Sequence, residues 1–80
     1  MKYTEKYSKY FWDVNVKSLD PKQHKNWIIS RILEEGGDEA VSDLFDNYNK
    51  REIEYVVENS RALSDKTKNF WKLKLSDNNV

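Results

Sequence analysis

The strongest constraint on the fold is a series of short amphipathic stretches, each bounded by helix start and stop signals. In the first, SLDPKQHKNWIISRILEEGGD, Asp20 is an N-cap residue and Pro21 suits the first helical position. The apolar residues that follow recur at helical spacing: Trp27, Ile28, Ile29, Ile32 and Leu33. Gly36 and Gly37 then end the helix, and one of them is expected in the left-handed conformation. The pattern predicts a helix over residues 21–35.

The second stretch begins directly after the glycines. Asp38 is the expected N-cap, and apolar residues again recur at helical spacing: Ala40, Val41, Leu44, Phe45 and Tyr48. The helix should end at residues 47–49, where two asparagines flank the tyrosine. This predicts a second helix over residues 38–48.

Two further helices complete the series. Asn49 with Glu52 three residues later forms a capping-box pattern, and the helix after it has an inner face of Ile53, Val56, Val57 and Ser60. The last helix starts at Ser64, and four of its residues are expected to face inward: Thr67, Phe70, Trp71 and Leu75.

The N-terminal part is patterned differently. Tyr3, Tyr7 and Tyr10 have helical spacing, but residues 1–9 are short and polar, which leaves either a frayed helix or a disordered arm. In YFWDVNV, residues 10–16, apolar and polar residues alternate, which favours an extended arm across the domain. We therefore expect an all-α fold: about four short helices after an extended aromatic arm, helix-turn-helix-like. Residues 1–9 should be a flexible or frayed segment, residues 10–76 a single helical domain, and residues 77–80 a disordered tail.

A core of this size must be built largely from aromatic side chains. The 80-residue chain has no cysteine and eleven aromatic residues, and a domain this small buries a limited share of its surface. Phe-Trp pairs occur at residues 11–12 and 70–71. We predict that both pairs are structural and lie near each other.

The sequence offers little for catalysis, cofactors or membranes. His24 is the single histidine, no glycine-rich loop precedes a helix, and no His or Cys cluster can hold a transition metal. No apolar run approaches the length of a membrane span, and no apolar stretch follows the charged N-terminus as in a secretory signal. We expect a cytoplasmic, non-enzymatic protein without cofactor or metal.

Charge is unevenly distributed along a chain whose formal net charge is zero. Residues 1–33 carry +4, residues 34–60 carry −7 and residues 61–80 carry +3. Glu39, Asp43 and Asp46 form an outward acidic stripe, extended by Glu54 and Glu58 on the next helix. With Tyr48 and Tyr55 as an apolar centre, this surface is the predicted site for a basic protein partner.

DNA binding is the alternative interpretation. Residues 38–48 and 50–60 could form a helix-turn-helix, with Lys50 and Arg51 at the start of the second helix contacting DNA. Three carboxylates in that helix, and the acidic helix before it, oppose phosphate binding. The lysines of the last helix lie around it rather than in one row, so they favour a solvated surface over a single-strand-binding site.

The order of motifs resembles a family of small bacterial proteins of unknown function. The motifs are Phe-Trp-Asp-Val at residues 11–14, Leu19-Asp20, the Ile-Ile-x-Arg-Ile-Leu segment at 28–33, Tyr48, Ser-Arg-x-Leu-Ser at 60–64, and Lys-Thr-x-Asn-Phe-Trp at 66–71. Together they span residues 11–75, and Asn49 stands where the family usually has glycine. Such proteins resemble those encoded beside nucleotidyltransferase toxins of the abortive-infection type. The resemblance implies a neighbouring gene product as partner, with this chain acting like an antitoxin, and transfers no catalytic residue.

Overall fold

The computed structural model describes residues 2–77, which form a helical fold without strands in that range. The elements are α1 (Lys2–Lys6), the 3-10 helices η1 (Ser8–Phe11) and η2 (Val16–Ser18), α2 (Lys25–Glu35), α3 (Asp38–Asn47), α4 (Lys50–Asn59) and α5 (Asp65–Asp77). The predicted all-α class is confirmed. Residues 78–80 of the expected tail lie outside the described residues, whereas Asp77 belongs to α5.

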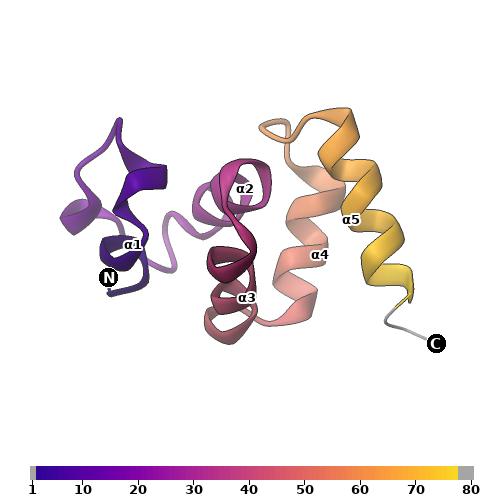
Figure 1. Cartoon of the computed structure of the whole chain (residues 1–80), viewed down its shortest axis with the longest axis horizontal. Coiled ribbons are helices and arrows are strands. Elements are labelled where there is room, and N and C mark those ends of the chain that lie inside the picture. The colour runs from indigo at the N-terminus through magenta and orange to yellow at the C-terminus, as the bar shows by residue number, and fades with distance from the viewer. Residues whose placement is uncertain (1, 78–80) are drawn as a thin grey trace.

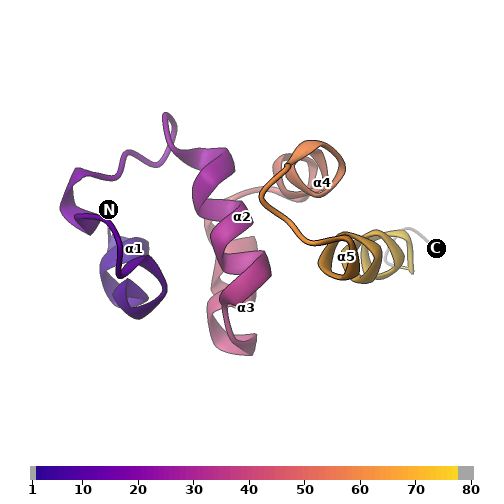
Figure 2. The same cartoon turned by 90° about the horizontal axis from the view of Figure 1, so that it is seen from above.

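The helices are arranged along one long axis. The molecule measures 37 × 23 × 22 Å, with α1 and the 3-10 helices at one end and α5 at the other (Figure 1). The central helices are α2 and α3, and α4 packs against both α2 and α5. Seen from above, α3 and α5 lie on the same side of α4 (Figure 2). This arrangement leaves α3 and α5 facing each other across one side of the molecule.

The core follows the predicted apolar faces of α2, α3 and α4. Its fully buried residues include Ile28, Ile29 and Ile32 from α2, Leu44 from α3, and Ile53, Val56 and Val57 from α4. Burying such side chains stabilises the fold by about 1.5–3 kcal/mol each relative to leaving them exposed. The helical spacing in the sequence therefore identified the core face of each central helix.

Helix α2 starts later than predicted, at Lys25 rather than residue 21. The Asp20 carboxylate accepts hydrogen bonds from the backbone N–H groups of Lys22 and Gln23, both at 2.8 Å, and the Asp20 N–H donates to His24 Nδ1 at 2.8 Å. Asp20 therefore caps a turn before the helix, because its side-chain bonds and the imidazole satisfy backbone groups locally.

The end of α2 does not use the left-handed conformation expected there. Neither glycine has a positive φ, and Gly36 is the extended C-cap, with its N–H bonded to the Ile32 carbonyl at 2.7 Å. A Cβ at Gly36 would lie 2.6 Å from the Ile32 carbonyl oxygen. That glycine is needed for close backbone approach, so the expectation of a left-handed cap is wrong.

The junction between α3 and α4 follows the sequence pattern. Tyr48 is the C-cap of α3, and Asn49 is the N-cap of α4. The Asn49 side chain accepts from the Glu52 N–H at 2.9 Å, and the Glu52 carboxylate accepts from the Asn49 N–H at 3.1 Å. The predicted capping box is confirmed.

The N-terminal segment packs on the domain instead of standing outside it. Residues 2–6 form α1, and Tyr3, Thr4 and Tyr7 are buried. The Tyr3 hydroxyl donates to the Ala40 carbonyl of α3 at 2.7 Å. A five-residue helix is marginal alone, so burial of its tyrosines is what stabilises it. Of the two alternatives left open for residues 1–9, the structure has the helix.

Residues 10–16 do not form the expected extended arm. Phe11 ends a 3-10 helix and is buried, whereas Trp12 is 77% exposed and Val14 39% exposed. The Arg31 guanidinium donates to the Tyr10 carbonyl at 3.1 Å and to the Asp13 carboxylate at 2.8 and 3.0 Å. These bonds hold the segment in a turn against α2. The alternation of apolar and polar residues over residues 10–16 therefore belongs to a turn, and the prediction of an extended arm is wrong.

The two Phe-Trp pairs are split between inside and outside, and they lie far apart. Phe11 packs on Trp27 with ring centroids 5.7 Å apart, and Trp71 packs on Phe45 with centroids 6.0 Å apart. Trp12 and Phe70 are exposed. Because η1 and α5 occupy opposite ends of the long axis (Figure 1), the prediction that the pairs are neighbours is wrong.

Candidate functional site

A groove of about 750 Å³ lies between α3 and α5. Its apolar lining is Leu33, Val41, Phe45, Phe70 and Trp71, and its polar and charged lining includes Glu34, Asp38, Ser42, Lys66 and Lys74. Most of the lining residues belong to α3 and α5, the two helices that lie on the same side of α4 (Figure 2). Two helices and the end of α2 therefore contribute to one surface.

Three aromatic rings form the apolar part of this groove. Trp71 is 8% exposed and packs on Phe45, while Phe70 packs edge-on against Trp71 with centroids 5.3 Å apart. Phe70 itself is 55% exposed. An edge-to-face ring pair fixes the orientation of both rings, so Phe70 is held at the mouth of the groove rather than folded into the core.

The start of α5 is fixed to α2 by one carboxylate. Glu34 accepts hydrogen bonds from the Ser64 N–H at 2.7 Å, from the Ser64 hydroxyl at 3.2 Å, and from the Thr67 hydroxyl. Hydrogen bonding from Thr67, and then from the Ser64 backbone, lowers the pKa of the Glu34 carboxyl below its ordinary value. These contacts tie the start of α5 to the end of α2, and Glu34, Ser64 and Thr67 all line the groove.

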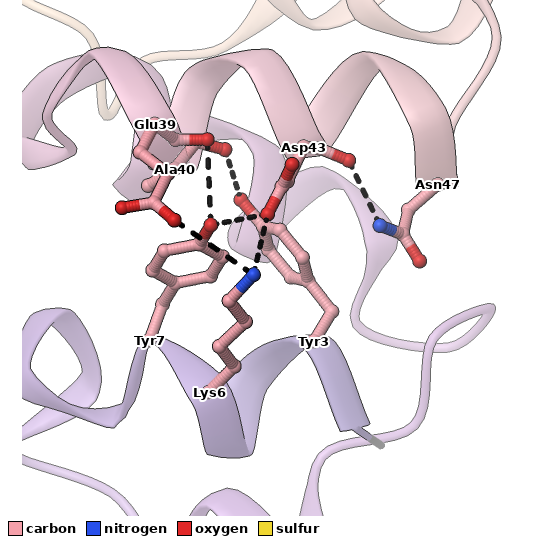
Figure 3. Close-up of polar contacts among 7 residues, drawn as sticks. All are labelled: Tyr3, Lys6, Tyr7, Glu39, Ala40, Asp43 and Asn47. Atoms are coloured by element: carbon pink, nitrogen blue, oxygen red, sulfur yellow. Dashed lines mark hydrogen bonds and ion pairs between the residues drawn. The ribbon is translucent and has the colours of Figure 1, made fainter.

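The predicted acidic stripe is partly covered by the N-terminal helix. The Tyr7 hydroxyl donates to the Asp43 carboxylate, and the Lys6 ammonium lies 3.1 Å from the same carboxylate and 3.9 Å from Glu39 (Figure 3). Glu39 and Asp46 remain exposed. Within the stripe, Asp43 is therefore bonded by the protein's own α1, and Glu39 and Asp46 are left open to solvent.

The contacts on Asp43 shift several pKa values together. The Tyr7 hydroxyl and then the Lys6 ammonium lower the pKa of Asp43, because both bond to its charged form. The hydrogen bond to Asp43 raises the pKa of Lys6, and burial raises that of Tyr7. This is the pattern of a stabilised ion pair with a phenol donor, and all three groups stay in their ordinary protonation states at neutral pH.

The two tyrosines predicted at the centre of the partner site are in different environments. Tyr48 is 6% exposed, and its hydroxyl donates to the Pro21 carbonyl at 2.9 Å. Tyr55 is 58% exposed and lines a smaller hollow of about 300 Å³ together with Trp27 and Arg61. Tyr48 is thus a core residue, because its ring fills the space beside the turn before α2, and Tyr55 alone of the two presents its ring to solvent.

The two basic residues of the DNA-binding alternative stand in the first turn of α4. Lys50 lies 3.7 Å from Glu54 in an i, i+4 pair, and Arg51 is exposed beside a hollow lined by Lys25, Glu52 and Tyr55. The Lys25 ammonium also pairs with Glu52 at 3.1 Å. The acidic residues of α4 thus neutralise part of the cationic surface around it.

Neither a metal centre nor a membrane helix is found in residues 2–77. No group of three or more His, Cys, Asp or Glu side chains there could hold a metal ion. Within the same residues, no helix combines the length and apolar character needed to cross a bilayer. His24 accepts a hydrogen bond from the Asp20 N–H and so takes part in the turn before α2.

Sequence reasoning missed the groove because its main features are tertiary. Phe70 was expected to face inward with Trp71, and no local pattern singled out Glu34. One signal was available for the covering of Asp43: the helical spacing of Tyr3, Tyr7 and Tyr10, which left a helix as one of two interpretations of residues 1–9. No local signal indicated which carboxylate that face would contact.

Comparison with known protein families gives a match over residues 7–57 to a family of unknown function, DUF6922. No curated protein and no solved structure matches the chain. The matched segment includes all of α2 and α3 and most of α4, and the closing motifs at residues 60–64 and 66–71 lie outside it. Because this segment covers more than half of the 80 residues, the chain belongs to DUF6922, a family of unknown function.

Proposed function

We propose that this protein is a non-enzymatic interaction module that holds a segment of a partner protein in the groove between α3 and α5. One observation carries the proposal: Phe70 stands half-exposed above Trp71 and Phe45, at the mouth of a groove of about 750 Å³. Aromatic side chains in a partly desolvated hollow are typical anchors of protein–protein interfaces.

The exposed apolar residues of α5 support this role. Phe70 and Leu73, three residues apart on α5, are 55% and 69% exposed. Single exposed apolar residues are common, but a contiguous apolar patch beside a groove is a mark of an interaction site. An 80-residue chain with a small core would gain stability by burying Phe70, so its exposure favours a function in binding.

The resemblance described above suggests the partner. A nucleotidyltransferase toxin encoded by the neighbouring gene is the proposed binding protein, and this chain would then act as its antitoxin. Glu39, Asp46 and Tyr55 are exposed and could add contacts to the basic cleft of such an enzyme. Asp43 and Tyr48, bonded within the domain, are not proposed as contacts.

The test is co-purification of the protein with the product of the neighbouring gene, followed by a binding measurement with matched variants. Phe70→Ala should weaken binding at least tenfold, because it removes the anchor at the groove. Trp12→Ala removes another exposed aromatic side chain, 77% exposed, which does not line this groove, and should change affinity less than threefold. Equal effects of the two variants, or no binding by the neighbouring gene product, would refute the respective part of the proposal.

DNA binding is a second candidate function, favoured by the position of Arg51. Arg51 is exposed in the first turn of α4, and a recognition helix contacts base edges with its N-terminal residues. Against this, the neighbouring Lys50 and Lys25 are paired with carboxylates. We expect no duplex affinity tighter than about micromolar at physiological salt. A sequence-dependent, nanomolar gel shift that Arg51→Ala abolishes would establish the alternative.

A further inference from the structure

We infer that the segment held in the α3–α5 groove is an amphipathic helix with acidic residues along the side that faces α5. This inference rests on the proposed function and specifies the chemistry of the partner. It follows from the shape of the groove and from the charges on its two walls.

The shape suits a helix. The groove runs between α3 and α5, and its apolar residues come from both walls and from Leu33 at the end of α2. A partner helix placed in such a groove presents apolar residues at i, i+3, i+4 and i+7. The exposed ring of Phe70, with Trp71 and Phe45 beneath it, gives such residues a contact surface.

The α5 wall is basic. Lys66 and Lys74 both line the groove, and eight helical residues separate them by about 12 Å along the axis. No ion pair joins either ammonium to a side chain in the part of the chain that the structure describes. Lys74 is held 5.7 Å from the centroid of the Phe70 ring, so a cation stands directly beside the apolar anchor.

The carboxylates that line the groove do not neutralise this wall. Glu34 is already bonded by Ser64 and Thr67. Asp38 lies in the first turn of α3, where the N-terminal end of the helix favours a negative charge. Ser42 is uncharged. A partner carboxylate placed beside Lys66 and another beside Lys74, seven or eight residues apart on one helix, would therefore meet unpaired cations.

A second copy of this chain does not supply such a helix. Its acidic helices are α3 and α4, and their apolar faces are buried within the domain, with Leu44 and Ile53 fully buried. Apart from the single exposed ring of Tyr55 on α4, neither helix can place a row of apolar side chains in the groove of a neighbour without unfolding. The occupant is therefore a helix of a different protein.

The experiment uses two synthetic helical peptides with the same apolar face. One carries glutamates seven residues apart beside that face, and the other carries lysines at the same positions. Binding to the full chain is followed by tryptophan fluorescence and by amide chemical shifts. At low salt we expect the acidic peptide to bind at least tenfold more tightly than its lysine twin, with chemical-shift changes at Phe70 and Val41, and we expect this preference to shrink as salt rises.

Charge reversal on α5 provides the matched control. Lys66→Glu with Lys74→Glu should reverse the preference between the peptides. Lys68→Glu with Lys72→Glu changes the net charge by the same amount outside the groove lining, and should keep the preference for the acidic peptide. Melting curves of both double variants verify that they are folded.

The outcomes separate this inference from the proposed function. If the lysine twin binds as tightly as the acidic peptide, with both sensitive to Phe70→Ala, the acidic helix is refuted and the groove remains an interaction site. If the neighbouring gene product binds without any effect of Phe70→Ala, the groove proposal fails as well. Self-association that shifts the Phe70 amide would identify a second copy as the occupant and overturn the inference.

Discussion

The Lys6 ammonium lies 3.1 Å from Asp43 Oδ2 and joins α1 to α3 across 37 positions of sequence. The Tyr7 hydroxyl bonds the same carboxylate, and the Tyr3 hydroxyl bonds the Ala40 carbonyl one turn earlier (Figure 3). The N-terminal helix therefore occupies part of the acidic surface of α3. This relationship moves the candidate interaction site from the acidic stripe to the groove beside α5.

Acid should destabilise the protein through its bonded carboxylates. The pKa values of Asp43, Glu34 and Asp13 are lowered in the folded state by hydrogen bonds from Tyr7, Thr67 and Arg31 respectively. In the unfolded chain these carboxyl groups have pKa values of about 4, so the unfolded chain binds more protons than the folded chain at low pH. Their contribution to the unfolding free energy is complete above about pH 5 and is lost as pH falls through the folded pKa values.

Urea unfolding between pH 7 and pH 2.5 measures this effect. The Asp43→Asn, Glu34→Gln double variant should show a weaker loss of stability with acid than the parent protein. An equal pH dependence in the two proteins would mean that other groups control acid unfolding.

Alkali should destabilise the protein through two tyrosines. Burial raises the pKa of Tyr48 to about 12 and raises the pKa of Tyr3 further. A tyrosine in the unfolded chain ionises at about pH 10, so the unfolded state releases its protons first. The free energy of unfolding should therefore fall as pH rises from about 10 to about 12. Phenolate absorbance should show that Tyr3 and Tyr48 ionise only with unfolding. Tyr48→Phe should remove the ionisation of one tyrosine from the unfolding transition. If all five tyrosines of the folded protein ionised near pH 10, the raised pKa values of Tyr3 and Tyr48 would be contradicted.

Substitution of the tryptophans should separate the two Phe-Trp pairs. Trp71 is 8% exposed and packs on Phe45, so Trp71→Ala should lower the unfolding free energy by about 3–5 kcal/mol. Trp12 is 77% exposed, and Trp12→Ala should change the unfolding free energy by less than about 0.5 kcal/mol. Thermal and urea denaturation of the two variants provide the comparison. A Trp71→Ala variant that melts within a degree or two of the parent would contradict the packing described here.

The two glycines after α2 should respond differently to alanine. A Cβ at Gly36 would lie 2.6 Å from the Ile32 carbonyl oxygen, a backbone atom that cannot move aside without disturbing α2. Gly36→Ala should therefore destabilise the protein by about 1–3 kcal/mol, as overpacking does. At Gly37 the nearest atom is the Tyr10 hydroxyl at 3.2 Å, so Gly37→Ala should be milder. Urea denaturation of both variants is the measurement, and the reverse order would show that close approach does not require glycine at 36.

The sequence alone determined those features that depend on neighbours within one or two helical turns. The apolar spacing of residues 27–33 predicted the buried face of α2, and Asn49 with Glu52 predicted the start of α4. Both were confirmed, because helix periodicity and capping bonds involve groups a few residues apart. The all-α class follows from several such local patterns that agree with one another.

Only the tertiary structure decided which of the residues expected on the surface are hydrogen-bonded or buried, and which apolar residues remain exposed to solvent. Asp43 is held by Lys6 and Tyr7, Tyr48 is buried against the turn at Pro21, and Phe70 remains half-exposed beside Trp71. Each outcome depends on contacts between segments 20 or more residues apart, or on space left between two helices. Local spacing specifies the face of a helix on which a side chain lies, whereas the free energy of its environment depends on which other helix packs against that face.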